Sequence, residues 1–194
     1  MVYRVLAIID SQKEALVAGF VQLEVSGRNW GYELKSTARF EYTDALKAQI
    51  SKGNGLSAVE YLQLHEDYGT WIAHCVNKFI EEQQLQFQVQ LIASPGLQLI
   101  SPGSYTVGDG AAIAAITGIN TVCDFKAMDA ALGGSNQQLA YQSLLPVTDV
   151  DQIEIVHTAL FAVLRWREEN NMMAGQTAAS RDSIGGAVWI GQEW

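Results

Sequence analysis

Apolar and polar residues at the start of the chain follow the two-residue period of β-strands. Residues 3–9 form an apolar run rich in β-branched side chains, and residues 15–24 form a second one. After a Ser-Gly-Arg-Asn turn at 26–29, the apolar residues Trp30, Tyr32 and Leu34 alternate with polar neighbours. Alternation of this kind is typical of a strand with one buried face. The pattern predicts a meander of three strands.

A helix is predicted to begin just after Ser57. The Ser-Lys-Gly-Asn-Gly segment at 51–55 interrupts the strand pattern, because glycine and small polar residues favour turns. Ser57 is followed three residues later by Glu60, which is the spacing of a capping box. The apolar residues that come next keep helical spacing: Tyr68, Trp71, Ile72, Cys75, Val76, Phe79 and Ile80.

The middle of the chain returns to strand-like alternation and then to a short helix. Phe87, Val89 and Leu91 alternate with glutamines, which predicts a half-buried strand. Two Ser-Pro-Gly triplets at 94–96 and 101–103 then impose loops. Further on, an Ala-rich helix is predicted with Asp109 as its N-cap and Gly118 at its C-terminal end, roles that suit these residue types.

The last third of the chain predicts a strand, a long helix and a final short strand. Residues 120–125 form an apolar strand, and apolar positions between 153 and 167 have the spacing of an amphipathic helix. Residues 187–190 could return as a last strand. The order of elements is three strands, helix, strand, helix, strand, helix and a final strand. Such an order predicts an α/β (α+β) fold with a mixed sheet covered by helices.

Composition narrows the range of functions. The chain has 194 residues, of which 48% are hydrophobic, and it carries a formal net charge of -9. This length favours one domain, and the negative charge argues against nucleic acid as a partner. The first ten residues do not resemble a signal peptide, and no uncharged apolar run approaches the roughly 20 residues of a membrane span. We therefore expect a cytoplasmic protein without a membrane partner.

The cysteines and histidines do not form a redox or metal-binding motif. Cys75 lies on the apolar face of a predicted helix and Cys123 lies in a predicted strand, so both are expected to be buried thiols without redox function. His65, His74 and His157 lack metal-ligand spacing, and no metal site is expected.

Two ordered blocks of sequence resemble the anhydro-N-acetylmuramic acid kinase family. The first runs from Thr106 to Gly134 and is similar to the family's I-G-D-x-A-x-I-A, T-G-I and D-F-R-x-x-D-x-A-x-G-G motifs. Its last part, at 124–134, reads D-F-K-A-M-D-A-A-L-G-G. The second block, at 159–189, contains T-A-A-S-R and resembles the family's closing T-G-A-S-R segment.

The resemblance implies a ribonuclease H-like domain, the fold that actin-like kinases repeat twice. We expect one copy here, a mixed five-stranded sheet flanked by helices over residues 1–194. Residues 1–145 would form its N-terminal part, and residues 150–194 would return as the closing helix and strand. In the family a second domain follows the D-F-R-x-x-D motif and carries much of the nucleotide site. Here the chain passes almost directly from Gly134 to the last long helix, so that domain is expected to be missing.

Departures from the family pattern fall at functional places. The family's glycine-rich M-S-G-T-S-x-D-G loop corresponds here to Ile-Ile-Asp-Ser-Gln-Lys-Glu-Ala at 8–15. A loop that cradles phosphate needs inward N–H groups and residues without Cβ atoms, whereas Asp10 and Glu14 would repel a triphosphate. Pro95 replaces the histidine of the family's S-H-G-Q-T segment. The family uses Mg-ATP, but we expect no cofactor for this chain.

Site residues can be carried over only from matching positions. Asp129 corresponds to the family's general base, which activates water for opening the anhydro ring, although a turn-capping role is the alternative from residue type. The resemblance assigns substrate binding to Asp109, Asp124, Gly133 and Gly134. From residue type alone, Asp109 is expected to cap a helix and Asp124 to accept a hydrogen bond from backbone at a strand end.

Three functions remain open from the sequence. The chain is expected to be a non-catalytic relative, a pseudoenzyme that serves as a binding, assembly or regulatory module in peptidoglycan recycling. Alternatively it supplies Asp129 to an enzyme completed by a partner chain, or it retains only saccharide binding. Because a domain that normally packs against a second one would expose an apolar face, a homodimer is expected, with a protein or a cell-wall sugar as the further partner.

Overall fold

The fold is known from a computed structural model that describes residues 1–27, 29–99, 106–125, 145–149, 152–170 and 187–189. The strands are β1 (Val2–Ser11), β2 (Ala15–Ser26), β3 (Asn29–Glu41), β4 (Leu91–Ser94), β5 (Leu97–Gln98), β6 (Thr106–Val107), β7 (Thr121–Cys123) and β8 (Ala187–Trp189). The helices are α1 (Asp44–Ile50), the 3-10 helix η1 (Gly53–Gly55), α2 (Ala58–Glu82), α3 (Gly110–Thr117) and α6 (Ile153–Asn170).

Six strands form one mixed sheet in the order β3-β2-β1-β4-β7-β8. The strands β1, β2 and β3 pair antiparallel as the predicted meander. The strands β1, β4 and β7 run parallel to one another, and β8 returns antiparallel beside β7. This arrangement confirms the predicted ribonuclease H-like mixed sheet. The sheet has six strands instead of five because the final short strand also pairs with it.

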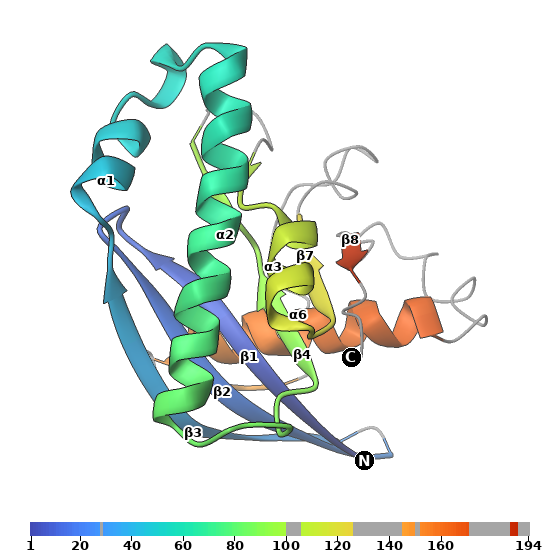
Figure 1. The fold of residues 1–194 in the computed structure, drawn as a ribbon. Helices are drawn as coiled ribbons and strands as arrows, with labels where there is room; N and C mark the ends of the chain where they lie inside the picture. Colours follow the sequence, from blue (N-terminus) through green and yellow to red (C-terminus); the bar gives the residue numbers. More distant parts are fainter. Residues whose placement is uncertain (28, 100–105, 126–144, 150–151, 171–186, 190–194) are drawn as a thin grey trace.

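Helices cover both faces of the sheet. Figure 1 shows α2 and α3 on one face and α6 crossing the other. The core under α2 and α3 includes Leu6, Leu16, Phe20, Ile72 and Phe79. The core under α6 includes Val5, Val21, Leu91, Val122 and Leu160. Because β1, β4 and β7 lie between two cores, most of their side chains are buried on both sides, with Val2 and Arg4 at the start of β1 as exposed exceptions.

The predicted helix signals are confirmed. The Ser57 hydroxyl accepts from the Glu60 amide and the Glu60 carboxylate accepts from the Ser57 amide, which completes the capping box of α2. Asp109 caps α3, and Gly118 closes it with a φ of 70°. Glycine is favoured there because other residues meet steric strain in the left-handed region.

A β-bulge interrupts the pairing of β2 with β3. Leu34 pairs with Val21 and Ser36 pairs with Phe20, so Lys35 has no partner residue on β2. The extra residue changes which face the even-numbered side chains occupy. Leu34 packs with the core under α6, whereas Phe40 packs with the core under α2.

The prediction of a strand through Phe87, Val89 and Leu91 is wrong for most of its length. Phe87 lies in a turn with a φ of 62° and is fully exposed. The strand β4 begins only at Leu91 and continues to Ser94. All four of its residues are buried, because a central parallel strand is covered on both faces and therefore does not alternate.

The two cysteines behave as predicted. Cys75 and Cys123 are buried and form no disulfide. Burial raises the pKa of the Cys75 thiol to about 12. A thiol with so high a pKa is a poor nucleophile at neutral pH.

Candidate functional site

The β1–β2 hairpin closes on itself through its own backbone. Gln12 and Lys13 both have left-handed φ values, 56° and 60°, although neither is glycine. The Lys13 amide donates to Asp10 Oδ2 at 3.0 Å, and the Glu14 amide donates to the Ser11 carbonyl at 3.0 Å. Two of the amides that a phosphate-binding loop would offer to a ligand are therefore engaged within the hairpin.

Asp10 is held by a pair of buried tyrosines. The Tyr42 hydroxyl donates to Asp10 Oδ1 and lies 2.8 Å from the Tyr68 hydroxyl. Because the Tyr42 proton is used by Asp10, the Tyr68 hydroxyl must donate to Tyr42. The Trp71 ring packs against both tyrosine rings. Burial is the main cause that raises the pKa of both tyrosines, so both remain neutral donors at physiological pH.

Ser94 ends the strand β4 with a buried hydroxyl. The residue is 1% exposed, and its Oγ has no hydrogen-bond partner among the residues that the structure describes. Leaving a buried hydroxyl unpaired costs about 1–3 kcal/mol. Gly96 follows with a φ of 78°, and a Cβ atom there would lie 2.9 Å from the Val107 carbonyl oxygen. The chain can therefore make this close turn past the end of β4 only with glycine.

Asp124 lies just past the end of β7 in a left-handed conformation, with a φ of 51°. Its Oδ1 accepts a 2.8 Å hydrogen bond from the Thr106 hydroxyl. The sequence predicts that Asp124 accepts a hydrogen bond from a backbone amide, whereas the donor in the structure is the Thr106 side chain. The pair joins β6 to the end of β7 and leaves Asp124 partly exposed.

Asp109 is positioned by the contact between α2 and α3. Its carboxylate accepts from the Ala111 amide at 2.8 Å, and its own amide donates to the His65 carbonyl at 3.1 Å. A Cβ atom on Gly69 would lie only 2.6 Å from the Asp109 nitrogen. The expected capping role is confirmed, and the glycine in α2 allows the N-terminus of α3 to approach so closely.

These residues gather at one edge of the sheet. The strands β1, β4 and β7 are parallel, so Asp10, Ser94 and Asp124 all lie at their carboxyl ends. Ligands of open α/β sheets bind at this edge. The edge offers carboxylates and hydroxyls, which suit a neutral polyhydroxylated ligand better than an anion. Of the other predicted site residues, Asp129, Gly133 and Gly134 lie outside the described residues.

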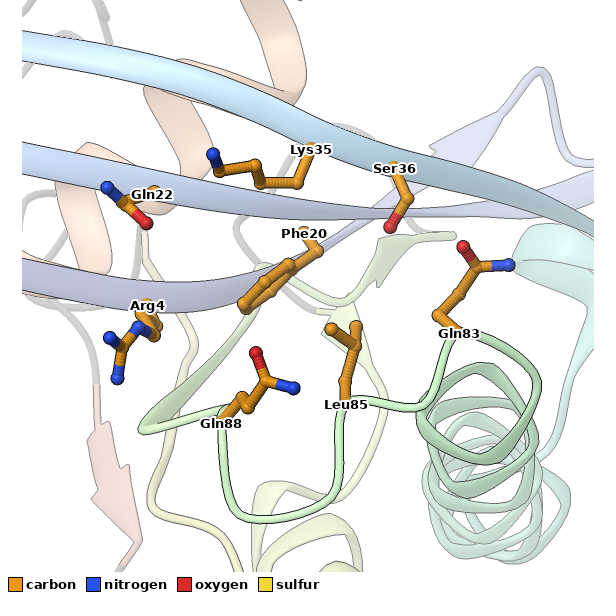
Figure 2. Close-up of a pocket in the computed structure, with 8 residues that line it drawn as sticks. All are labelled: Arg4, Phe20, Gln22, Lys35, Ser36, Gln83, Leu85 and Gln88. Carbon is orange, nitrogen blue, oxygen red and sulfur yellow. The ribbon is translucent and has the colours of Figure 1, made fainter.

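A hollow lies near the opposite end of β1 and was not predicted from the sequence. Figure 2 shows its lining, which comes from β1, β2, β3 and the loop after α2. No sequence signal indicated it, because the residues involved are separated along the chain and lack a motif. Within the described residues, no group of acidic, histidine or cysteine side chains could hold a metal ion. No helix in the described part of the chain is long and apolar enough to cross a bilayer.

Comparison with known proteins agrees with the resemblance. The sequence model of the family described as anhydro-N-acetylmuramic acid kinase matches residues 23–156. The chain is also similar to the anhydro-N-acetylmuramic acid kinase of Saccharophagus degradans, with 39% identity over 87 residues. That alignment covers 40% of this chain and 24% of the relative.

The match covers Asp109 and Asp124 and also reaches Asp129. The turn of the β1–β2 hairpin precedes the matched residues, and the second resembling block, at 159–189, follows them. The role of each site residue therefore stays a prediction. Since the family model spans more than half of the sequence, this chain belongs to the anhydro-N-acetylmuramic acid kinase family.

Proposed function

We propose that this chain is a non-catalytic member of the family that acts as a binding, assembly or regulatory module in the turnover of cell-wall amino sugars. The observation that carries the proposal is the closed β1–β2 hairpin. Phosphoryl transfer depends almost wholly on positioning the phosphates and their metal. A hairpin that engages its own amides cannot supply that positioning.

Charge at the hairpin supports the same conclusion. The amides of Lys13 and Glu14 are used internally, and Asp10 and Glu14 add two carboxylates to the hairpin. A triphosphate placed here would meet two carboxylates and would lose the backbone donors that normally offset its charge. Mg-ATP is therefore expected not to bind.

The short interval after the D-F-K-A-M-D-A-A-L-G-G segment at 124–134 also supports the proposal. Residues 135–152 alone separate Gly134 from Ile153, the first residue of α6. In the family that this chain resembles, a second domain lies in this interval and carries much of the nucleotide site. Eighteen residues, from 135 to 152, are too few to build an independent domain.

The proposal can be tested by thermal unfolding with Mg-ATP and, separately, with anhydro-N-acetylmuramic acid. A ligand at about 100 times its dissociation constant stabilises the native state by about 2.7 kcal/mol. No shift with Mg-ATP and no phosphorylated sugar are expected. Phosphorylation of the sugar by the purified chain would refute the proposal. The partner-completed enzyme would be favoured if ATP raised the melting temperature and the sugar were phosphorylated only when a partner chain was added. In that case Asp129→Asn should abolish the activity.

Saccharide binding without ATP is a second candidate function, and the unpaired Ser94 hydroxyl favours it. A ligand hydroxyl could bond this group at the same edge as Asp124. In the free protein, Ser94→Ala should be neutral or stabilising, because it removes an unpaired buried polar group. Loss of sugar binding in Ser94→Ala and Asp124→Asn, with unfolding unchanged in the first, would support this function. Unchanged sugar binding in both variants would place the sugar elsewhere, and no sugar binding by the original protein would exclude this function.

A further inference from the structure

The hollow near the opposite end of β1 is an open depression with a mixed polar and apolar lining. Its volume is about 410 Å³, which lies within the range of ligand pockets. Figure 2 shows that the lining residues come from β1, β2, β3 and the loop after α2: Arg4, Phe20, Gln22, Lys35, Ser36, Gln83, Leu85 and Gln88. Arg4 lies near the start of β1 and Asp10 near its end, so this hollow is separate from the edge described above.

One positive charge in the hollow is available to a ligand. Lys35 forms an ion pair with Glu33 at 2.5 Å. Arg4 forms no ion pair within the part of the chain that the structure describes, although the whole chain has a net charge of -9. A guanidinium offers a planar set of donors that matches a carboxylate.

The glutamines in the hollow offer acceptors. The Gln22 Nε2 donates to Glu24 Oε1 at 3.0 Å, and the Gln88 Nε2 donates to the Gln84 carbonyl at 3.0 Å. Because each Nε2 faces its acceptor, the oxygen of the same amide points away from that acceptor. Figure 2 shows the oxygens of Gln22, Gln83 and Gln88 directed toward the hollow. Such oxygens accept hydrogen bonds from ligand hydroxyls.

The backbone around the hollow departs from regular geometry in two separate segments. Lys35 is the extra residue of the β3 bulge, and bulges often re-aim side chains beside functional sites. In the loop after α2, Gln84 and Phe87 have φ values of 55° and 62°. Left-handed conformations of non-glycine residues cost about 1–3 kcal/mol and cluster at ligand sites.

We propose that this hollow binds a small hydroxylated carboxylate of the sugar-acid class. Arg4 would bind the carboxylate, and the glutamine oxygens would accept from the hydroxyls. The Phe20 and Leu85 side chains form an apolar floor that is almost fully buried, so a ligand would gain mainly from polar contacts. Arg4 can match one negative charge, and the Glu24 carboxylate, which accepts from Gln22 beside the hollow, would repel a dianionic phosphate more strongly than a carboxylate.

Three hexoses that differ only at carbon 6 provide the test: glucuronate, glucose and glucose 6-phosphate. Binding would be followed by amide chemical shifts of the isotope-labelled full chain. Glucuronate should shift the amides of the lining residues and bind more tightly than either of the others. Tighter binding of glucose 6-phosphate, or no shift at these residues with any of the three, would overturn the proposal.

Arg4→Gln should weaken glucuronate binding about tenfold, since a charge-assisted bond contributes at least 1.4 kcal/mol. Arg39→Gln is the matched control, because Arg39 lies on β3 outside the hollow and pairs with Glu41. Its glucuronate affinity should equal that of the original protein. The amide spectrum of Arg4→Gln shows whether this variant is folded. A second variant, Gln88→Ala, keeps Arg4 and should also weaken glucuronate binding. Equal affinity in the folded Arg4→Gln variant, or in Gln88→Ala, would contradict the proposal.

Discussion

Replacement of Gly69 by alanine should destabilise the protein, although alanine is the better helix former. Gly69 lies within α2, where it faces the N-terminus of α3. An added Cβ atom would lie 2.6 Å from the Asp109 nitrogen, 2.7 Å from its carbonyl oxygen and 3.0 Å from its Cα atom. All three are backbone atoms, so no side chain can rotate away, and α3 itself must move.

The magnitude follows from that displacement. Ordinary van der Waals contact begins at 3.4 Å, so the 2.6 Å contact must lengthen by about 0.8 Å. Overpacking of this kind costs about 1–3 kcal/mol, and weakening the bond from the Asp109 amide to the His65 carbonyl adds about 1 kcal/mol. The better helix propensity of alanine returns about 1 kcal/mol. The net expectation is a loss of about 2 kcal/mol in the free energy of unfolding.

Urea and thermal unfolding would measure this loss, which should lower the melting temperature by roughly 4–8 °C for a domain of this size. Gly31→Ala is the control, since a Cβ atom there has no neighbour within 4 Å. Its stability should change by no more than about 0.5 kcal/mol. If Gly69→Ala were as stable as the original protein, the close contact between α2 and α3 described above would be refuted.

Three further predictions concern α2. Ser57→Ala removes the N-cap and should lower the free energy of unfolding by about 1 kcal/mol in urea titration; an unchanged midpoint would contradict the capping box. The Glu60 pKa is lowered to about 2, first by its hydrogen bond with Lys52 and then by those with Ser57. The Glu60 carboxylate therefore contributes stability above pH 4.5, and this contribution is lost as the pH falls toward 2. In a Glu60→Gln variant, the free energy of unfolding should lack this decrease between pH 4.5 and 2. Cys75 should react with an alkylating reagent at neutral pH far more slowly than a free thiol, as mass spectrometry can measure, whereas rapid labelling of the folded chain would show that its burial is wrong.

Local signals in the sequence predicted the elements whose structure is determined locally. The capping box at Ser57 and the glycine at 118 marked helix ends because the side chain or the backbone itself satisfies the terminal groups. The strand β4 was predicted too early, with only Leu91 in common, because a central strand is buried on both faces and does not alternate. The seven-residue helix α1 was also missed, since a helix this short depends on tertiary packing.

The candidate site was predictable only in part. Asp109 and Asp124 could be named from the family motif, and a capping role for Asp109 could be inferred from residue type. The link from Asp10 through Tyr42 to Tyr68 could not, because it joins three elements that lie far apart along the chain. Likewise, the Ser94 hydroxyl is unpaired because of the residues that pack around it in the fold, and a local sequence pattern does not identify those residues.

The bulge at Lys35 has a consequence for how relatives are aligned and engineered. Substitutions of Lys35 should be tolerated by the pairing of β3, and deleting it should remove the bulge, because Leu34 and Ser36 already pair with the neighbouring residues Val21 and Phe20. Ala38 and Phe40 would still face the core under α2, because they would keep their partners Ala18 and Leu16 on β2. A relative with an unbroken β3 must therefore carry a one-residue gap opposite Lys35. In that relative, the side chains that pack under α6 and those that pack under α2 would be an odd number of positions apart, whereas here the bulge makes that number even.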